Sequence, residues 1–457
     1  MGRLFGTDGI RGVANADLST ELVDRVARAA VHVLAPRRRG RVAIGRDPRI
    51  SGDLLEAQFA AGLCSAGADA IRLGVLPTPG VALLARRLNV DAGVVISASH
   101  NPVEDNGIKF FAPTGFKLPD AVEDEIERLV ESAAGLPRPS GVSVGRITDV
   151  PDAAEQYLAF LSGLAGGRFA GWRIVVDCAN GATSAIAPRL WEALGATVIP
   201  IHAEPDGTNI NAGCGSTHPE VVAEAVVRHR ADLGFAHDGD GDRVIAADRR
   251  GHVVDGDAIM GIAALHRDRQ GLLPGHAIVA TVMTNLGLEV ALRGAGIRIE
   301  RAKVGDRYVL ERMLETGSTL GGEQSGHVIF LDHATTGDGL LTAVQIANVM
   351  LEAGRGLDEL ASRFHRYPQV LLNVRVQAPD RWVDDPEILA AVSRAERRLG
   401  DRGRVLVRAS GTEPLVRVMT ECEDAGDAES LARELADLVA GRLGGTVVAR
   451  PKGAEAK

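Results

Sequence analysis

The clearest chemical signal in the sequence is a run of alternating carboxylates and glycines, His237-Asp238-Gly239-Asp240-Gly241-Asp242-Arg243. Carboxylates at every second position can point at one centre as hard oxygen ligands, which Mg²⁺ and Ca²⁺ require. An EF-hand does not fit, because Arg243 stands where that loop needs glycine and Arg249 where it needs a bidentate glutamate. Three carboxylates leave an octahedral ion short of ligands, and Mg²⁺ usually completes its shell with water and a phosphate. The alternative is a solvated acidic turn, which is disfavoured because crowded carboxylates repel one another unless a cation neutralises them.

A second candidate follows the short β-branched run Val94-Val95-Ile96, which is typical of a buried strand. This run leads into Ser97-Ala98-Ser99-His100-Asn101-Pro102, a segment of small polar residues that ends in a proline. Such a strand would present a hydroxyl and an imidazole at its end, and Lys109 on the next apolar segment is close enough in sequence to return there. An ordinary turn rich in serine and asparagine explains the same residues, so this stretch alone decides nothing.

Two glycine-bearing loops could bind anions. The first, Gly6–Gly12, holds Arg11 and precedes any regular element that we predict, so it is not the dinucleotide fingerprint, which follows a strand. The second, Arg408–Pro414, follows a predicted strand and, with Arg417, offers two guanidinium groups beside a glycine turn. The alternatives are a structural glycine turn for the first loop and a helix N-cap turn for the second.

A third loop, Gly321–His327, could recognise a polyhydroxyl compound. It offers a carboxylate, a hydroxyl and an imidazole between glycines, from Glu323, Ser325 and His327. The carboxylate could accept bonds from two sugar hydroxyls or face an amine. A polar hairpin between two strand-like runs is the alternative.

Size and charge narrow the classes of protein to which the chain can belong. Its 457 residues are enough for two to four domains, and the formal net charge is −9 without a long basic run. Nucleic acid is therefore not an expected partner. No apolar run approaches the roughly 18–20 residues of a membrane span, and the N-terminal residues lack the apolar core of a signal peptide. We expect a cytoplasmic protein with no membrane partner.

Cysteine and lysine usage adds two expectations. The chain has four cysteines: Cys64, Cys178, Cys214 and Cys422. They lack C-x-x-C spacing, so free thiols are expected rather than a zinc site or a disulfide framework. Only five of the 51 lysine and arginine residues are lysines. An internal lysine can therefore mark a site that needs an ammonium group, which favours Lys109 and Lys303 and, more weakly, Lys117.

Three segments share the order strand, turn, helix, small-residue stop and strand: Arg41–Gly74, Trp172–Ile201 and His276–Ala302. This order predicts βαβ units and mostly parallel sheets, and its repetition predicts three similar α/β domains. From Gln369 the pattern changes to a smaller α+β domain with a strand, a helix, a strand pair and a helix. We place the domains at 1–150, 151–252, 253–367 and 368–450, followed by a disordered tail at 451–457.

Taken together, these segments resemble the α-D-phosphohexomutase superfamily, and within it the members that act on glucosamine phosphates. The resemblance rests on seven motifs that occur in order between Phe5 and Pro414: F-G-T-D-G-I-R-G, I-S-A-S-H-N-P, D-N-G-I-K-F-F, D-G-D-G-D-R, V-G-D-R-Y-V, G-G-E-Q-S-G-H and R-A-S-G-T-E-P. It implies three α/β domains and a smaller fourth around a central cleft, with each domain contributing a loop.

The resemblance also implies a role for each motif. Ser99, rather than Ser97, would carry a phosphoryl group. One Mg²⁺ per chain would be held by an oxygen of that phosphoryl group and by Asp238, Asp240 and Asp242. The groups implied around the transferred phosphoryl are Arg11, Lys109, His100, Asn101 and Arg243. Those implied to hold the sugar are Glu323, Ser325 and His327. Those implied to hold the phosphate that is not transferred are Arg408, Ser410, Gly411, Thr412 and Arg417.

The reaction that the resemblance implies is an isomerisation by phosphoryl shuffling. Glucosamine 6-phosphate and glucosamine 1-phosphate would interconvert through a 1,6-bisphosphate, with glucosamine or glucose 1,6-bisphosphate as intermediate or activator, to supply UDP-N-acetylglucosamine and cell-wall synthesis. The nearest alternative is phosphoglucomutase/phosphomannomutase activity on neutral hexose phosphates. A non-catalytic phosphosugar sensor and a phosphomonoesterase are more distant alternatives. A homodimer is a further expectation from the resemblance alone.

Overall fold

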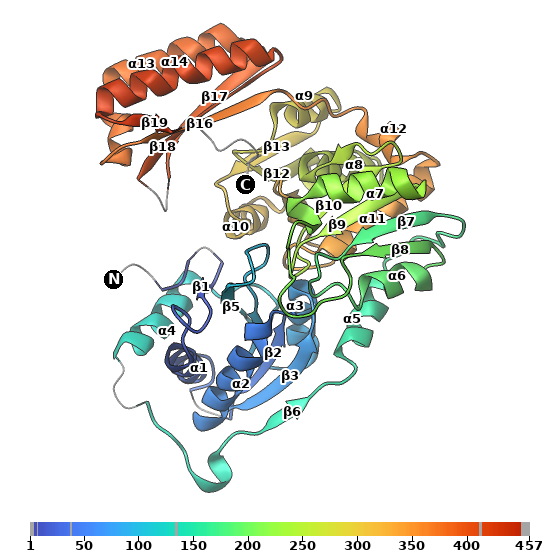
Figure 1. Cartoon of the computed structure of the whole chain (residues 1–457), viewed down its shortest axis with the longest axis vertical. Coiled ribbons are helices and arrows are strands. Elements are labelled where there is room, and N and C mark those ends of the chain that lie inside the picture. Colours follow the sequence, from blue (N-terminus) through green and yellow to red (C-terminus); the bar gives the residue numbers. More distant parts are fainter. Residues whose placement is uncertain (1–3, 7, 37–38, 133–135, 411–413, 449–457) are drawn as a thin grey trace. The chain divides into compact units, whose positions relative to one another are not determined.

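A computed structural model of the chain describes residues 4–6, 8–36, 39–132, 136–410 and 414–448 (Figure 1). The chain divides into two compact units, one of Met1–Met283 with Ile297–Ser362 and the other of Thr284–Gly296 with Arg363–Lys457. The first unit contains three mixed sheets and the second contains one antiparallel sheet. The predicted tail at 451–457 lies outside the described residues, as do Gly411 and Thr412.

The first sheet has the strand order β1-β5-β4-β2-β3-β6. Its strands are β1 (Ile10–Val13), β2 (Arg41–Arg46), β3 (Asp69–Val75), β4 (Ala92–Ile96), β5 (Asp105–Phe111) and β6 (Ile147–Asp149). The helices that accompany it are α1 (Thr20–Leu34), α2 (Ile50–Ser65), α3 (Thr78–Arg87) and α4 (Asp120–Ser132). Helix α1 starts after Ser19, whose side chain accepts a hydrogen bond from the N–H of Leu22, and its apolar face joins the core of this sheet.

The second sheet has the order β11-β10-β9-β7-β8. Its strands are β7 (Arg173–Asp177), β8 (Thr197–Ile201), β9 (Leu233–His237), β10 (Val244–Asp248) and β11 (Val253–Val254). The helices in this part of the chain are α5 (Ala153–Ser162), α6 (Ala187–Ala193) and α7 (Pro219–His229). Strand β9 is fully buried and leads directly into the aspartate-glycine run.

The third sheet has the order β13-β12-β14-β15. Its strands are β12 (Ala277–Thr281), β13 (Arg298–Ala302), β14 (Leu320–Gly322) and β15 (Val328–Phe330). The neighbouring helices of the same compact unit are α8 (Gly256–Arg269), α10 (Asp306–Thr316), α11 (Gly339–Ala353) and α12 (Leu357–Ala361). Helix α9 (Leu286–Gly294) connects β12 to β13 in the chain but clusters with the second compact unit.

The second compact unit is built on the sheet β17-β18-β16-β19, in which every pair is antiparallel. Its strands are β16 (Gln369–Arg375), β17 (Gly403–Ala409), β18 (Leu415–Cys422) and β19 (Thr446–Val448). Helices α13 (Pro386–Leu399) and α14 (Ala425–Leu443) lie on one face of this sheet and close its apolar core (Figure 1). The smaller α+β domain is therefore confirmed.

The three βαβ segments are also confirmed, but the sheets are less parallel than predicted. The parallel pairs are β4–β2–β3–β6, β9–β7–β8 and β13–β12–β14, and each sheet then adds antiparallel neighbours. The cause is the short connections after β4, β9 and β14, because adjacent strands joined by a few residues can only be antiparallel. Arg11 is a second correction, since it lies on β1, paired with Gly107 of β5, and not in a loop.

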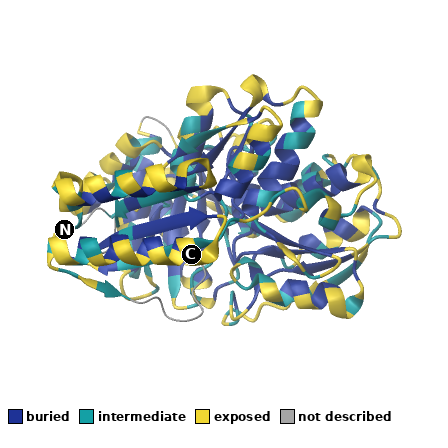
Figure 2. Cartoon of the chain, turned by 90° about the horizontal axis from the view of Figure 1, so that it is seen from above, coloured by how far each residue is buried: buried dark blue, intermediate teal, exposed yellow. Residues whose placement is uncertain are grey.

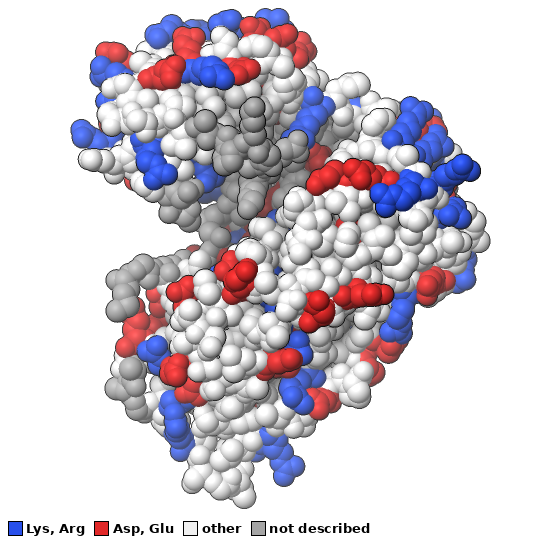
Figure 3. All heavy atoms as spheres, in the orientation of Figure 1, with Lys and Arg blue, Asp and Glu red and all other residues white. Residues whose placement is uncertain are grey.

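Burial follows the usual pattern of layered α/β domains. The strands are mostly buried, and the helices expose one face (Figure 2). Basic and acidic groups are interspersed on the face drawn in Figure 3, so the described residues form no single basic field there. The four cysteines are free, and all but Cys64 are buried. None of the described helices is both long and apolar enough to cross a membrane.

Candidate active site

Ser99 lies in the short connection between β4 and β5 and is only 1% exposed. Its Oγ donates a hydrogen bond to Oδ2 of Asp238 at 2.7 Å and lies 3.2 Å from Nδ1 of His100. The backbone of Ser99 has a φ of 53°, a left-handed conformation that is uncommon for a residue with a side chain. A strained residue of this kind persists only where the surrounding structure holds it, and such residues cluster at functional sites.

The aspartates of the predicted metal loop converge in the connection between β9 and β10. Each of Asp238, Asp240 and Asp242 is buried, and each offers a ligand atom within 4.8 Å of the others. Oδ1 of Asp240 and Oδ1 of Asp242 are buried without a hydrogen-bond partner, which is costly for an oxygen of this kind. Hard oxygen donors that are buried, clustered and unsatisfied fit a divalent cation such as Mg²⁺.

Two carboxylates of this triad, Asp238 and Asp242, have opposite pKa shifts. Burial, together with the charges of Asp242 and Asp240, raises the pKa of Asp238 well above its usual value. Burial alone would also raise the pKa of Asp242, but the nearby Lys109 and His327 outweigh burial and lower it. A bound cation would favour the ionised form of all three.

Lys109, on β5, supplies the cation closest to the triad. Its Nζ lies 2.8 Å from Oδ2 of Asp240 and 2.9 Å from Oδ2 of Asp8, and the side chain is 2% exposed. Burial alone would lower the pKa of Lys109, but the carboxylates of Asp240 and Asp8 outweigh burial and raise it. The side chain is therefore an ammonium group at neutral pH.

Arg11 shares a carboxylate with Lys109. Its Nη2 lies 2.5 Å from Oδ2 of Asp8, and its Nη1 donates to Oδ1 of Asn101 at 3.4 Å. Asn101 in turn donates from Nδ2 to Asp105 at 2.8 Å. The two cations that the resemblance pairs around a phosphoryl group are thus brought together by Asp8.

His100 and Arg243 complete the surroundings of Ser99. The positive charge of Arg243, with burial and Arg11, lowers the pKa of His100 to about 3, so this imidazole is neutral at neutral pH. Nε of Arg243 lies 3.9 Å from Oδ2 of Asp238 and 3.8 Å from Oδ1 of Asp242. The guanidinium group therefore lies beside the triad.

The predicted sugar loop connects β14 to β15 in the same compact unit. Glu323 and Ser325 are half-buried, and Oε1 of Glu323 accepts a hydrogen bond from the N–H of Gly305 at 2.9 Å. His327 is 2% exposed; its Nε2 accepts from the N–H of Gly337 at 3.0 Å, and its Nδ1 lies 3.6 Å from Oδ2 of Asp242. The loop thus links the sugar-binding candidates to the acidic triad.

Lys117 joins two of these regions. Its buried ammonium donates to Oδ1 of Asp8 and to Oδ2 of Asp306, the first residue of α10. Oδ2 of Asp306 is also 3.9 Å from Nε2 of His327. Lys117 was the weaker lysine candidate in the sequence, yet it bridges the first and third sheets. Lys303, the stronger candidate, is exposed and lies over the ring of Tyr308 at 5.6 Å.

The phosphate-binding candidates lie by themselves in the second compact unit. Arg408 on β17 is directly opposite Arg417 on β18 in the strand register. Burial and the charge of Arg417 lower the pKa of Arg408. Like charges directly opposite one another destabilise a sheet, so this arrangement favours an anion between them. The N–H of Ser410 donates to the carbonyl of Leu415 at 2.8 Å.

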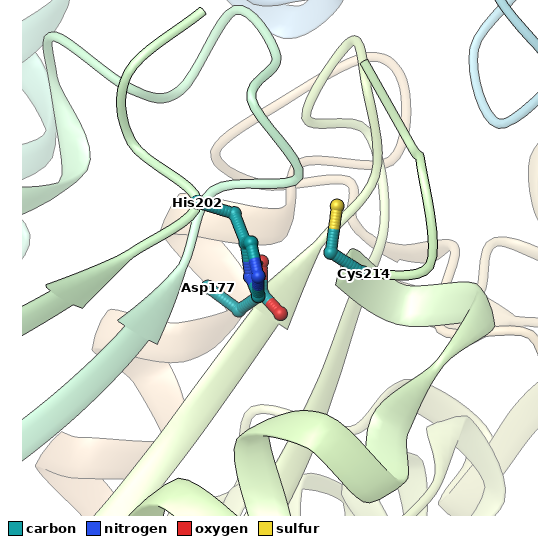
Figure 4. Close-up of side chains that lie close together, drawn as sticks. All are labelled: Asp177, His202 and Cys214. Carbon is teal, nitrogen blue, oxygen red and sulfur yellow. The ribbon is translucent and has the colours of Figure 1, made fainter. Parts of the chain in front are cut away.

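A second group of possible metal ligands, Asp177, His202 and Cys214, has a structural explanation (Figure 4). Both carboxylate oxygens of Asp177 already accept backbone N–H groups, Oδ1 from Ala179 and Oδ2 from Gly215, each at 3.0 Å. Nδ1 of His202 lies 3.2 Å from Oδ1 of Asp177. These contacts tie together the two ends of the connection that runs from His202 to Gly215, so we assign the group to the anchoring of that loop.

Four residues that contact the site loops were not identified from the sequence: Asp8, Arg49, Asn211 and Asp306. Asp8 could have been found, because it lies in the same glycine-rich motif as Arg11. Arg49 and Asn211 carry no such signal, since each meets the serine turn only through the tertiary fold.

Family models of phosphoglucomutase/phosphomannomutase match most of the chain between residues 2 and 438. The α/β/α domains I, II and III match residues 2–135, 156–251 and 255–367, and the C-terminal domain matches residues 371–438. The solved structure of a phosphoglucomutase/phosphomannomutase family protein from Burkholderia thailandensis is similar, with a TM-score of 0.81 and 25% identity over 97% of this chain and 99% of that one. The Aspergillus fumigatus N-acetylphosphoglucosamine mutase shares the fold, with a TM-score of 0.69 and 18% identity over 96% of each chain.

Two related sequences have a higher identity to this chain than the two solved structures have. The phosphoglucosamine mutase of Pelotomaculum thermopropionicum is 56% identical over 441 residues, which cover 96% of this chain and 99% of that protein. The phosphoglucosamine mutase of Saccharopolyspora erythraea is 56% identical over 444 residues, again 96% of this chain and 99% of that protein. This chain therefore belongs to the phosphoglucosamine mutases of the phosphoglucomutase/phosphomannomutase family.

Proposed function

We propose that the chain interconverts glucosamine 6-phosphate and glucosamine 1-phosphate by carrying a phosphoryl group on Ser99. The observation that supports this most directly is the hydrogen bond of the Ser99 hydroxyl to Asp238, inside a buried triad that Lys109 also contacts. Phosphoryl transfer depends mainly on positioning and on neutralising charge, and this part of the chain offers both.

The reaction consists of two transfers in opposite directions. In the first, O1 of glucosamine 6-phosphate attacks the phosphorus on Ser99; the P–Oγ bond breaks as the P–O1 bond forms, and in net terms the hydroxyl proton passes to Oγ. The 1,6-bisphosphate then turns over. In the second transfer, Oγ attacks the phosphorus at O6, the P–O6 bond breaks, and the proton returns to O6. The product is glucosamine 1-phosphate, and the phosphoserine is restored.

The residues around Ser99 have distinct tasks in this scheme. Lys109 and Arg11, fixed by Asp8, provide positive charge for the phosphoryl oxygens. His100 stays neutral and lies at hydrogen-bond distance from Oγ, so its imidazole can donate or accept a hydrogen bond there without adding charge. Asn101 orients Arg11, and Arg243 helps position the phosphoryl group.

The triad would hold one Mg²⁺ per chain through Asp238, Asp240 and Asp242, together with a phosphate oxygen on Ser99. When bound, the ion would withdraw negative charge from the transferring phosphoryl group. The buried oxygens without partners described above support this assignment.

The two ends of the substrate would be held by different loops. Glu323 and Ser325 would bind the sugar, with His327 in support. The phosphate that is not transferred would lie between Arg408 and Arg417, with Ser410, Gly411 and Thr412 around it. The four predicted segments would then divide the work: 1–150 carries the serine, 151–252 the metal loop, 253–367 the sugar loop and 368–450 the phosphate loop.

The cellular setting is also part of the proposal. A chain of this kind would act in the cytoplasm, supply glucosamine 1-phosphate for UDP-N-acetylglucosamine and cell-wall synthesis, and be started or restored by glucosamine or glucose 1,6-bisphosphate. We propose that it works as a homodimer.

Replacement of Ser99 by alanine tests the proposal. Intact-protein mass should show a phosphoryl group on the wild type and none on Ser99→Ala, and the variant should melt like the wild type but make no glucosamine 1-phosphate. Parallel assays with glucosamine, glucose and mannose 6-phosphates should favour the amino sugar. Retained activity with a phosphate at another residue, or a higher rate with glucose 6-phosphate, would contradict the proposal.

A further inference from the structure

The turn that carries Ser99 is held through its backbone carbonyls by two side chains. The carbonyl oxygen of Ser99 accepts hydrogen bonds from Nη2 of Arg49 at 3.0 Å and from Nδ2 of Asn211 at 2.9 Å. The carbonyl oxygen of Asn101 accepts from the same two nitrogens, at 2.8 and 3.1 Å. Two carbonyl groups of the same turn are therefore fixed from two directions.

Arg49 lies between β2 and α2, at the N-cap of α2, and is itself rigidly placed. Its side chain and that of Asp47 are both 0% exposed, and Nε of Arg49 lies 2.9 Å from Oδ2 of Asp47. The same Asp47 oxygen accepts the hydroxyl of Ser97 at 2.5 Å, and that hydroxyl accepts the N–H of Ser99 at 2.9 Å. One side of the turn is thus held from within the first sheet.

Asn211 approaches from the second sheet, 112 positions away in sequence from Ser99. The loop that carries it is tied at its base by Asp177, which accepts the N–H groups of Ala179 and Gly215. Figure 4 shows where Asp177 lies beside His202 and Cys214. The N–H of Asn211 also donates to the carbonyl of Ala179 at 2.9 Å, and its φ is 57°. The backbone of Asn211 is therefore fixed at the point from which its side chain reaches the turn.

The serine turn, the metal loop and the Asn211 amide pack closely against one another at Gly239. A Cβ added to Gly239, between two aspartates of the triad, would lie 2.6 Å from the carbonyl oxygen of Ser99 and 2.9 Å from Nδ2 of Asn211. Glycine is required at this position because the serine turn, the metal loop and the Asn211 amide meet there. A displacement of the turn would therefore move Ser99 relative to Asp238.

We propose that Asn211 is a positioning residue whose side-chain amide holds Ser99 in its left-handed conformation, with Oγ against Asp238. The inference rests on the proposed role of Ser99 as the phosphoryl carrier. A left-handed serine is costly unless neighbouring groups hold it, and the amide donates hydrogen bonds to two carbonyl oxygens of the turn, those of Ser99 and Asn101. The metal-binding part of the chain then determines the geometry of the serine as well as that of the cation.

Two substitutions of Asn211 test this and spare its backbone. Asn211→Asp keeps the shape and tolerates a positive φ but cannot donate a hydrogen bond, and Asn211→Gly removes the side chain and also tolerates that φ. The matched control is Asn209→Asp in the same loop, because among the described residues the side chain of Asn209 bonds to Glu204 and Asp206 of that loop and not to the serine turn. The full-length chain is assayed with Mg²⁺ and glucosamine 6-phosphate.

Both Asn211 variants should lower kcat by roughly 10- to 100-fold while KM for glucosamine 6-phosphate stays near the wild-type value, since only the alignment of the serine changes. Hydrogen exchange should be faster in the peptide that contains Ser99. Asn209→Asp should match the wild type in both measurements.

Three outcomes would overturn the inference: unchanged kcat in Asn211→Gly, an equal loss in Asn209→Asp, or exchange in the Ser99 peptide that is the same in all variants. Hydrogen exchange does not depend on activity. An inactive wild type would thus refute the proposed function, while the exchange result would still decide whether Asn211 holds the turn.

Discussion

A single carboxylate, that of Asp8, brings three cationic side chains of this site together. Asp8 accepts Arg11 and Lys109 through one oxygen and Lys117 through the other. Burial alone would raise the pKa of Asp8, but Lys109, Lys117 and Arg11 outweigh burial and lower it well below its usual value. An ionised Asp8 fixes three cations at once, which explains why lysine, rare in this chain, is kept at two of these positions.

Replacement of Lys109 by arginine should lower kcat by about 100-fold or more even though the charge is kept. The ammonium contacts Asp8 and Asp240 in a space that is almost closed to solvent, and a planar guanidinium group cannot occupy it without moving one of these carboxylates. Steady-state kinetics measures the loss, and thermal melting confirms that the variant is folded. Turnover close to that of the wild type would reject the requirement for a compact cation.

At the scale of elements, the site loops share one structural position. The serine turn, the metal loop, the sugar loop and the phosphate loop each connect two strands that are antiparallel neighbours: β4–β5, β9–β10, β14–β15 and β17–β18. A short connection of this kind leaves its residues little freedom. The three sheets of the first compact unit therefore present their functional residues on stiff hairpin ends instead of long loops.

The buried carboxyl group that caps helix α11 should make the stability of the chain depend on pH. Asp338 caps the helix by accepting the N–H of Leu341 at 2.9 Å, and it also accepts the hydroxyl of Tyr157 at 2.8 Å. Burial nevertheless raises the pKa of Asp338 to about 6. At pH values between the pKa of this carboxyl in the unfolded chain and its pKa in the folded chain, the folded state binds more protons. The free energy of unfolding therefore falls as the pH rises through this range, and it is level at higher pH.

Asp338→Asn should remove this pH dependence and keep the helix cap. The free energy of unfolding of the wild type should fall by about 1 kcal/mol relative to the variant between about pH 5 and about pH 7.5. Urea titrations of both proteins at the two pH values measure the difference. An equal change in the free energy of unfolding of the two proteins between the two pH values would show that Asp338 is not the group that titrates.

Sequence patterns predicted most of the helices and strands, and they identified the candidate site residues within each motif. Strand β8 ends the predicted segment Trp172–Ile201, and helix α13 is the first helix predicted after Gln369; a glycine and a capping aspartate mark where they begin. Strand β1 was missed because its four residues include a glycine and lie beside a glycine-rich turn. Asn211 and Arg49 could not be found in this way, since their partners are carbonyl oxygens, which leave no trace in the sequence.

At the scale of the whole molecule, the serine and the phosphate-binding arginines belong to different compact units. A substitution that removes phosphate binding by these arginines should therefore leave the phosphorylation of Ser99 intact. Arg408→Ala should raise KM for glucosamine 6-phosphate by roughly 10- to 100-fold, because a charged hydrogen-bonding partner of phosphate is lost. The phosphoryl group on Ser99 should be unaffected, as judged by intact mass.

The matched control is Arg433→Ala on α14, because Arg433 is exposed and pairs with Glu429 four residues earlier in the same helix. This variant should retain the wild-type KM. An Arg408→Ala variant with unchanged KM would remove Arg408 from the phosphate site, and one without phosphate on Ser99 would show that the two functions are not separable.

The burial of the active-site lysines has a practical consequence for labelling. Lys109 and Lys117 are enclosed by carboxylates, whereas Lys303 is exposed, and Lys452 and Lys457 lie outside the described residues. An amine-reactive dye or surface linker would then find one accessible lysine between residues 4 and 448, Lys303, among those that the structure describes. The chain could be tethered or made fluorescent there without occupying the ammonium groups that the chemistry needs.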